Sequence, residues 1–294
     1  MSRFCKENIV LLKRIEGALK KRRIRSARHE AETLVRHFGG MDRIDLFTGK
    51  KGVSPRSKRR AEAALRARVR GVPLGYVLRR ADFYGRPFFV NRHVLVPRPE
   101  TELLVEQALE ILRSGKNAGR HLRILDAGTG SGCVAVSLTI ERPDCRITAL
   151  DISSQALKVA ARNIRFYGLE KKIRLVQSDL FGAFGKRQKG YWDAVVSNPP
   201  YIPSRAIAGL PPEVRHEPLL ALDGGRDGLG AIFSLVDRAP FFIKAGGWLL
   251  LEIGAGQAKA LAGKLKESGG YRHFRFIKDL RGIERVLIAK ISSE

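Results

Sequence analysis

The chain has 294 residues, 44% of them hydrophobic, and a net charge of +26. This length suits two domains, and the apolar fraction is ordinary for a globular protein. The sequence lacks both the run of roughly 20 apolar residues that a membrane helix needs and a signal-peptide core at its amino terminus. We therefore expect a soluble cytoplasmic protein without a membrane partner, and we expect a monomer. The three cysteines and six histidines have no metal-ligand spacing, so neither disulfides nor a metal site are expected.

The positive charge is concentrated in the first quarter of the chain. Residues 1–70 hold 21 Lys and Arg against 7 Asp and Glu, whereas the other 224 residues hold 34 against 22. A positive field of this kind favours nucleic acid, or a partner that works on it. The alternative is a basic proteome whose helices have solvated, charged faces.

Residues 1–75 are predicted to form a small helical domain. Apolar residues recur at three- and four-residue spacing from Ile9 to Leu19 and from Ala27 to Phe38, as in amphipathic helices. A short helical piece is expected at 42–47, and the Ala- and Arg-rich segment 57–69 is strongly helix-prone. Residues 76–98 change period and predict a β-hairpin linker, with its turn at 91–93.

Residues 99–294 read as an α/β domain, because strand-like and helical segments alternate after a first helix. A largely parallel, Rossmann-like sheet is expected, with the last strand antiparallel because no helical pattern separates the final two strands. Seven strands are predicted at 122–126, 146–151, 173–177, 193–197, 247–253, 272–278 and 285–291. Residues 198–228 are expected to form a long loop over the carboxyl edge of the sheet, a length that is commonly functional.

A glycine-rich loop follows the first predicted strand and reads as a nucleotide-type site. Glycines there permit positive φ and let the backbone approach a ligand closely. Asp151 ends the next strand, where a carboxylate can accept ribose hydroxyls. Asp179 follows the third strand and is placed to meet the exocyclic amine of a base. The alternative is a packing turn with two helix-capping aspartates. The loop residues are Gly128, Thr129, Gly130, Ser131 and Gly132.

The tetrapeptide Asn198, Pro199, Pro200 and Tyr201 follows the fourth parallel strand. Prolines end ladder pairing and stiffen the chain in an extended loop. The segment presents an amide, backbone carbonyls and an aromatic ring, which suit a planar NH2 group. Taken alone, it could equally be a Pro-Pro turn with a solvent-facing Asn.

Together these motifs resemble the Rossmann-like S-adenosylmethionine-dependent methyltransferases that act on amino groups. Further segments are similar to the family that methylates a glutamine of peptide chain release factors, and the likeness covers about residues 70–292. One departure is Leu180, since some relatives have an aromatic residue after the third-strand acid. The segments are Arg70–Tyr76, Phe83–Gly85, Val94–Glu102, Glu217–Leu229, Leu251–Gly254 and Asp279–Gly282.

The resemblance implies a protein-(glutamine-N5) methyltransferase. The loop 128–132 would face the methionine part of S-adenosylmethionine, Asp151 the ribose, and Asp179 with Leu180 the adenine. The Asn198 side-chain oxygen and the Pro199 carbonyl would accept hydrogen bonds from the substrate amide. Tyr201 would stack on the plane of that amide. A general base is not required before attack, and the helical domain would recognise the release factor.

Three alternatives remain at this stage. The same tetrapeptide would accept an adenine or guanine amino group of nucleic acid, which the basic charge favours and the amino-terminal helices disfavour. A ribosomal-protein glutamine is a close variant of the release-factor substrate. A non-catalytic nucleic-acid-binding protein would need a lost cofactor position, and none is apparent.

Overall fold

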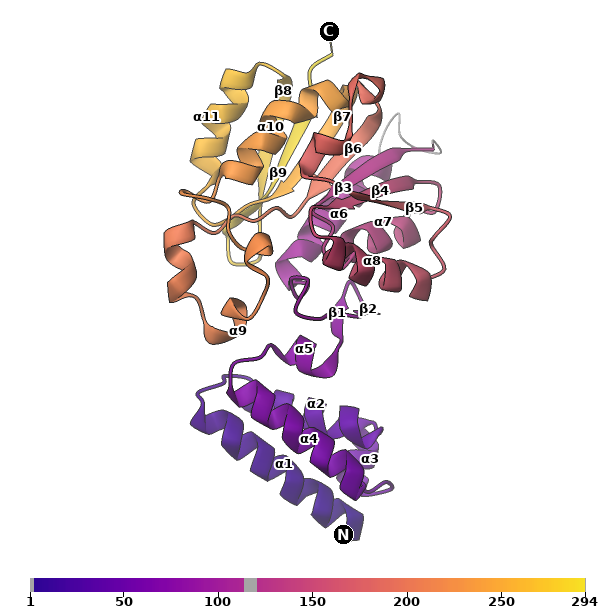
Figure 1. Ribbon diagram of the computed structural model, residues 1–294, viewed down its shortest axis with the longest axis vertical. Coiled ribbons are helices and arrows are strands. Elements are labelled where there is room, and N and C mark those ends of the chain that lie inside the picture. Colours follow the sequence, from indigo (N-terminus) through magenta and orange to yellow (C-terminus); the bar gives the residue numbers. More distant parts are fainter. Residues whose placement is uncertain (1–2, 114–120, 294) are drawn as a thin grey trace. The chain divides into compact units, whose positions relative to one another are not determined.

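The computed structural model describes residues 3–113 and 121–293 and divides into two units (Figure 1). One unit comprises Met1–Arg80 together with the short segment Pro211–His216. The other comprises Ala81–Leu210 and Glu217–Glu294. Within the described ranges, none of the helices is long and apolar enough to cross a membrane.

The first unit is helical, as the apolar spacing predicts. Its core is made by the inward faces of the helices, with Leu12, Ile15, Leu34 and Leu46 fully buried. Local signals set the boundaries; for example, the Ser54 side chain accepts a hydrogen bond from the Ser57 amide at the start of one helix, as N-cap serines do. The helices are α1 (Arg3–Lys21), α2 (Ala27–Gly39), α3 (Arg43–Thr48), α4 (Pro55–Val69) and α5 (Leu74–Leu78), with α9 (Pro212–Arg215) from the separate segment.

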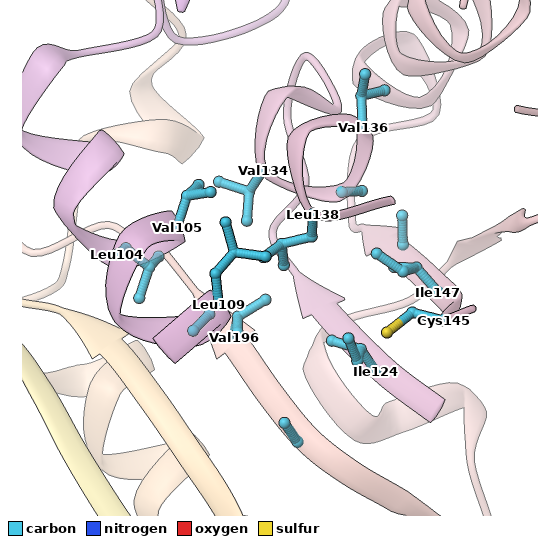
Figure 2. Close-up of a cluster of buried hydrophobic side chains, with 14 of the residues drawn as sticks. Leu104, Val105, Leu109, Ile124, Val134, Val136, Leu138, Cys145, Ile147 and Val196 are labelled. Carbon is cyan, nitrogen blue, oxygen red and sulfur yellow. The ribbon is translucent and has the colours of Figure 1, made fainter. Parts of the chain in front are cut away.

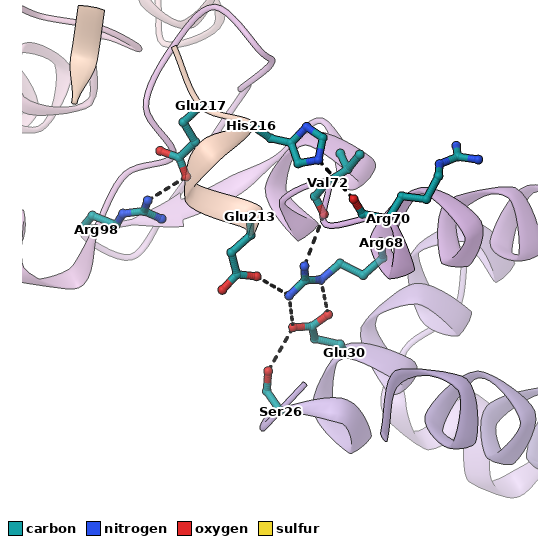
Figure 3. A network of polar contacts seen from close by, with 9 residues as sticks. All are labelled: Ser26, Glu30, Arg68, Arg70, Val72, Arg98, Glu213, His216 and Glu217. Atoms are coloured by element: carbon teal, nitrogen blue, oxygen red, sulfur yellow. Dashed lines mark hydrogen bonds and ion pairs between the residues drawn. The ribbon is translucent and has the colours of Figure 1, made fainter. Parts of the chain in front are cut away.

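An ion cluster joins three segments of this unit (Figure 3). Arg68 is only 6% exposed and donates to both carboxylate oxygens of Glu30, at 2.7 and 3.1 Å. The same guanidinium pairs with Glu213, and the His216 ring lies 3.2 Å from the Arg70 carbonyl. A residue of the long loop thus completes the ion cluster of the helical unit. Nothing in the periodicity of residues 198–228 predicts this excursion.

A two-stranded hairpin opens the second unit. β1 (Ala81–Phe83) pairs antiparallel with β2 (Arg86–Phe88). The turn residues Tyr84 and Gly85 have φ of 51° and 70°, the left-handed pair that two-residue hairpins require. The hairpin is therefore present, but its predicted turn at 91–93 is wrong, because the two left-handed residues lie earlier in the chain.

The second unit is built on a seven-stranded sheet of order β5-β4-β3-β6-β7-β9-β8. Strands β5, β4, β3, β6 and β7 are parallel to one another. Strand β9, the last in the chain, lies between β7 and β8 and is antiparallel to both. The predicted fold class and antiparallel last strand are thus confirmed. The strands are β3 (Arg123–Ala127), β4 (Arg146–Asp151), β5 (Ile173–Gln177), β6 (Trp192–Ser197), β7 (Ile243–Glu252), β8 (Tyr271–Lys278) and β9 (Glu284–Ile291).

Helices cover both faces of this sheet, and successive strand residues enter opposite cores. Ile124 shares one core with residues of α6 and α7 (Figure 2) and of α8, whereas Leu125 shares the other with residues of α10 and α11. Because both faces are buried, the strands read as continuous apolar runs. These helices are α6 (Pro99–Arg113), α7 (Cys133–Glu141), α8 (Ser154–Phe166), α10 (Gly230–Phe242) and α11 (Ala258–Ser268). Short 3-10 turns are η2 (Leu180–Ala183), η3 (Lys186–Gln188), η4 (Ser204–Gly209) and η5 (Leu219–Ala221).

Candidate active site

A cavity of about 450 Å³ opens at the carboxyl ends of β3, β4, β5 and β6. Open α/β sheets keep their ligands at this edge, because the loops after parallel strands meet there. The lining joins two sets of residues that lie far apart in the sequence, the glycine loop with its acids and the start of the tetrapeptide. The predicted residues that line it are Gly128, Thr129, Gly130, Ser131, Asp151, Asp179, Leu180, Asn198 and Pro200.

The glycine loop turns between β3 and α7 in a conformation that favours glycine. Gly128, Gly130 and Gly132 have φ of 74°, 54° and 80°. An added Cβ at Gly130 would meet nothing within 4 Å, so this glycine leaves its space to the cavity. The Thr129 amide donates to the Leu150 carbonyl at 2.8 Å, which ties the loop to the end of β4.

Asp126 supports this loop from inside the protein. It is 1% exposed and accepts a 2.6 Å hydrogen bond from the Thr129 hydroxyl. Burial raises the pKa of Asp126 to about 7, against the opposing effect of that hydrogen bond. The carboxyl therefore fixes the glycine loop and is partly neutral near pH 7.

Asp151 ends β4 and lines the cavity, as predicted. Its two carboxylate oxygens each accept one backbone N–H at 2.9 Å, from Gly130 and from Ser153. Burial raises the pKa of Asp151, while these two bonds lower it. Each oxygen retains further acceptor capacity, so the carboxylate can also hold hydroxyl groups in the cavity.

Asp179 and Leu180 line the cavity just after the carboxyl end of β5. Asp179 is exposed, and Leu180 has φ of 44°, which is strained for a residue with a branched side chain. The Ser178 hydroxyl holds the turn by donating to the Leu180 carbonyl at 2.7 Å and accepting from the Ala183 amide at 2.9 Å. These two hydrogen bonds hold the strained turn, and Leu180 lines the cavity.

The tetrapeptide begins where β6 ends. The Ser197 hydroxyl donates to the Ala127 carbonyl at 2.6 Å, which joins the ends of two neighbouring strands. Asn198 donates through Nδ2 to the Thr101 hydroxyl at 3.0 Å, and its Oδ1 accepts no hydrogen bond from the described residues. Pro199 is buried, and its carbonyl likewise accepts none from the described part of the chain.

Tyr201 turns toward the protein interior and is not among the residues that line the cavity. Its hydroxyl donates to Glu252 Oε1 at 3.2 Å, and burial raises the pKa of Tyr201. Burial also raises the pKa of Glu252 to about 7, while hydrogen bonding by Thr101 and Tyr201 acts in the opposite direction. Sequence reasoning missed Thr101 and Glu252. For Glu252 the sequence did offer a signal, because it is an acid at the end of an otherwise apolar strand segment.

The long loop packs closely on the tetrapeptide. The Ile202 amide donates to the Leu222 carbonyl, and the Gly224 amide to the Ile202 carbonyl, at 3.0 and 2.9 Å. A Cβ added to Gly228 would lie 2.3 Å from the Tyr201 carbonyl oxygen. Gln257 donates to the carbonyls of Tyr201 and Gly228 at 3.1 and 3.0 Å. The glycines after Asp223 thus allow the loop to brace the tetrapeptide.

Arg98 and Glu217 form an ion pair beside the cavity (Figure 3). Arg98 lines the cavity, and its guanidinium lies 2.7 Å from Glu217 Oε1. The Glu217 side chain is 1% exposed, so it is committed to holding the loop. Among residues 3–113 and 121–293, no group of three or more His, Cys, Asp or Glu could hold a metal ion.

Two family models and many named relatives match this chain. A family model described as "PrmC N-terminal domain" matches residues 11–78, and one described as "Methyltransferase small domain" matches residues 101–209. The release factor glutamine methyltransferase of Gloeobacter violaceus is 39% identical over 261 residues, which cover 88% of this chain and 89% of that relative. The protein of the same name from Cereibacter sphaeroides is 41% identical over 271 residues, covering 91% and 92%.

A solved structure supports the fold. The T. thermophilus 16S rRNA N2 G1207 methyltransferase, in complex with AdoMet and guanosine, is 19% identical and has a TM-score of 0.51. The match covers 72% of this chain and 49% of that chain. At this identity the likeness shows a shared methyltransferase fold and does not distinguish between substrates.

Proposed function

The chain belongs to the release factor glutamine methyltransferase family, and on that premise we propose the reaction that its cavity performs. The enzyme transfers a methyl group from S-adenosylmethionine to the side-chain amide nitrogen of a glutamine in a peptide chain release factor. The observation that carries the proposal is Asn198. It lines the cavity with an Oδ1 that accepts no hydrogen bond from residues 3–113 and 121–293, at the carboxyl end of the strand beside the glycine loop.

The cavity residues fit the cofactor. S-adenosylmethionine, when bound, supplies an electrophilic methyl group on a sulfonium centre. We assign the loop 128–132 to its methionine part, because Gly130 leaves open space there. Asp151 would hold the ribose hydroxyls with its remaining acceptor capacity. Asp179 and Leu180, which line the cavity just after β5, would hold the adenine.

The tetrapeptide would position the amide that receives the methyl group. An amide nitrogen is a weak nucleophile, because its lone pair is delocalised into the carbonyl. The Asn198 Oδ1 and the Pro199 carbonyl would accept its two N–H groups and stabilise the positive charge that develops on the nitrogen. Holding the amide in line adds several kcal/mol of barrier reduction. Pro200 stiffens the segment. Tyr201 packs outside the cavity lining, so in place of the predicted stacking on the amide plane we assign it to holding the segment through its hydroxyl bond to Glu252.

The helical unit would recognise the release factor. It matches a domain model of this family, and exposed Lys58, Arg59 and Arg60 give it a positive surface for an acidic patch of the partner. Exchanging these three residues for Glu should raise the KM for the release factor while the affinity for S-adenosylmethionine stays unchanged. We also propose that the enzyme acts as a monomer, which light scattering of the purified protein tests directly.

The decisive experiment measures which substrate receives a labelled methyl group. Purified protein is incubated with S-adenosylmethionine carrying a labelled methyl group, together with release factor, ribosomal protein, DNA and RNA in separate reactions. We expect label on the release factor, at a glutamine side chain located by tandem mass spectrometry. Label only on nucleic acid would overturn the proposal in favour of an adenine or guanine amino group as the methyl acceptor. The net charge of +26 would then help to bind the nucleic acid.

A further inference from the structure

A line of polar side chains runs from the cavity into the core of the second unit. It starts at Asn198, whose Nδ2 donates to the Thr101 hydroxyl on α6 at 3.0 Å. Thr101 in turn acts by hydrogen bonding on Glu252 at the end of β7, to which Tyr201 also donates. Thr101 and Glu252 are 3% and 1% exposed. Buried polar groups in such a line are costly unless each has a defined donor and acceptor.

The catalytic use of Asn198 depends on which end of its amide faces the cavity. The oxygen and the NH2 group are nearly equal in size, and a half-turn about the side chain exchanges them. Only Oδ1 can accept an N–H from a substrate amide. Thr101 alone does not decide the orientation, because a hydroxyl can either accept from Nδ2 or donate to Oδ1.

Glu252 removes this ambiguity. An ionised carboxylate only accepts, so the Tyr201 hydroxyl donates to it, and the Thr101 hydroxyl, whose hydrogen bonding also lowers the pKa of Glu252, can act on it only as a donor. Its Oε2 is buried without a hydrogen-bond partner among the described residues, so the carboxyl has acceptor capacity left for a second donor. With its own hydrogen directed to Glu252, Thr101 presents a lone pair to Asn198, and that lone pair can only receive Nδ2.

We propose that Glu252 and Thr101 are positioning residues, which hold the Asn198 amide with Oδ1 facing the substrate. The inference rests on the proposed function, because it concerns the group that would accept the glutamine N–H. Glu252 does not touch substrate in this account. It makes the Thr101 hydroxyl a donor toward the carboxylate, and Thr101 then accepts a hydrogen bond from Nδ2 of Asn198.

The ionisation of Glu252 then controls the orientation near neutral pH. A protonated carboxyl can donate to Thr101, and the fixed direction of the line is lost. The charged and titratable groups around it are Tyr201 on the loop, Glu100 on α6 and Arg285 on β9; Arg98 also acts on Tyr201. Burial outweighs these neighbours and raises the pKa of Glu252 to about 7. Transfer should therefore increase as the pH rises through about 7.

The first test compares kinetics of matched variants. Glu252→Gln and Thr101→Val keep side-chain size but change or remove the donor and acceptor pattern. Each should lower kcat about 10- to 100-fold, the usual effect of residues that orient a functional group from behind. The affinity for S-adenosylmethionine should change little, Thr101→Val should lower the melting temperature as other buried Thr→Val changes do, and Thr101→Ser should restore most of the activity. The lower limb of the pH–kcat profile should disappear in Glu252→Gln.

Two control variants separate positioning from general stability. Thr139 is buried on α7, where its hydroxyl donates to the Ala135 carbonyl at 2.8 Å. Asp193 is 9% exposed and accepts from the Arg123 amide and from Lys244. Thr139→Val and Asp193→Asn should destabilise the fold without lowering kcat. If they lower kcat as much as the test variants do, the effect is structural and the inference is overturned.

The second test does not depend on the identity of the substrate. Nitrogen NMR of the cofactor-free protein follows the side-chain NH2 signals of Asn198, assigned by their loss in Asn198→Ala. These signals should titrate with a midpoint near pH 7 in the wild type and stay constant in Glu252→Gln. Titration without a matching kcat effect on release factors would contradict the proposed function alone. Signals that do not titrate would overturn the inference, whatever substrate the enzyme methylates.

Discussion

The two halves of the cavity use glycine for opposite purposes. On the cofactor half, Gly130 faces open space, and a Cβ there would meet nothing within 4 Å. On the tetrapeptide half, Gly228 faces protein, and a Cβ would lie 2.3 Å from the Tyr201 carbonyl oxygen. One glycine leaves room for a ligand, and the other lets two backbone segments touch. Replacing Gly130 should therefore leave the protein folded but weaken cofactor binding. Replacing Gly228 should instead disrupt the packing of the loop on the tetrapeptide.

The largest effect of a substitution on stability is expected for Gly228→Ala. The new Cβ overlaps backbone, and φ of 80° is strained for any residue with a side chain. The two costs together should lower the free energy of unfolding by about 3 kcal/mol and reduce methyl transfer strongly. Urea unfolding and the labelling assay measure both. Gly209→Ala lies on the same loop with open space at its Cβ and ordinary φ, and it should change neither. Retention of full stability by Gly228→Ala would contradict the close packing.

The two halves should respond alike to pH, because each contains a buried carboxyl whose pKa is raised to about 7. These carboxyls belong to Asp126 and Glu252, and the folded state holds their protons more tightly than the unfolded chain does. Their contribution to stability is complete below their ordinary values of 3.8 and 4.5 and is lost as the pH rises through 7. The free energy of unfolding of the cofactor-free protein should fall by on the order of 4 kcal/mol for Asp126 and 3 kcal/mol for Glu252.

Urea unfolding at a series of pH values checks this loss. Asp126→Asn and Glu252→Gln should each remove one part of the pH dependence. If neither substitution changes the pH dependence of unfolding, neither carboxyl has a raised pKa in the folded protein.

A smaller and more selective effect is expected for Gly130→Ala on the cofactor half. Its φ of 54° costs about 1 kcal/mol of stability with a side chain present, and the methyl group projects into the cavity. The affinity for S-adenosylmethionine should fall about tenfold by calorimetry, because the cofactor loses close approach to the backbone. Gly190→Ala is a matched control, with φ of 56° and open space around its Cβ. It should show the same stability loss and normal cofactor affinity; equal affinities for the two variants would contradict the assignment.

The smallest effect should follow from Leu180→Gly. Glycine relieves the strain at φ of 44°, which offsets the lost packing of the side chain, so the free energy of unfolding should change by less than about 1 kcal/mol. The affinity for S-adenosylmethionine should still fall a few-fold if Leu180 packs on the adenine. A large loss of stability with unchanged affinity would show that Leu180 serves the core rather than the cofactor.

Much of this arrangement could be predicted from local patterns. Apolar runs predicted the seven strands, and the residues that follow strand ends predicted which side chains meet at the carboxyl edge. The partners of Asn198 and Tyr201 could not be found in this way. Thr101 is separated from Asn198 by 97 positions, and Glu252 from Tyr201 by 51. Such contacts depend on strand order and on how α6 packs, which periodicity does not encode. The Pro211–His216 excursion was missed for the same reason, since Arg68 recruits Glu213 from 145 residues away.

The most direct test of the account measures Asn198→Ala in two assays on the same preparation. The account predicts that kcat for methyl transfer to the release factor falls about 100- to 1,000-fold, as expected when one preorganised group that stabilises developing charge is removed. The dissociation constant of S-adenosylmethionine should stay within about twofold, because the glycine loop and Asp151 hold the cofactor. Loss of cofactor affinity with kcat retained at saturation would contradict the account and place Asn198 on the cofactor half of the cavity.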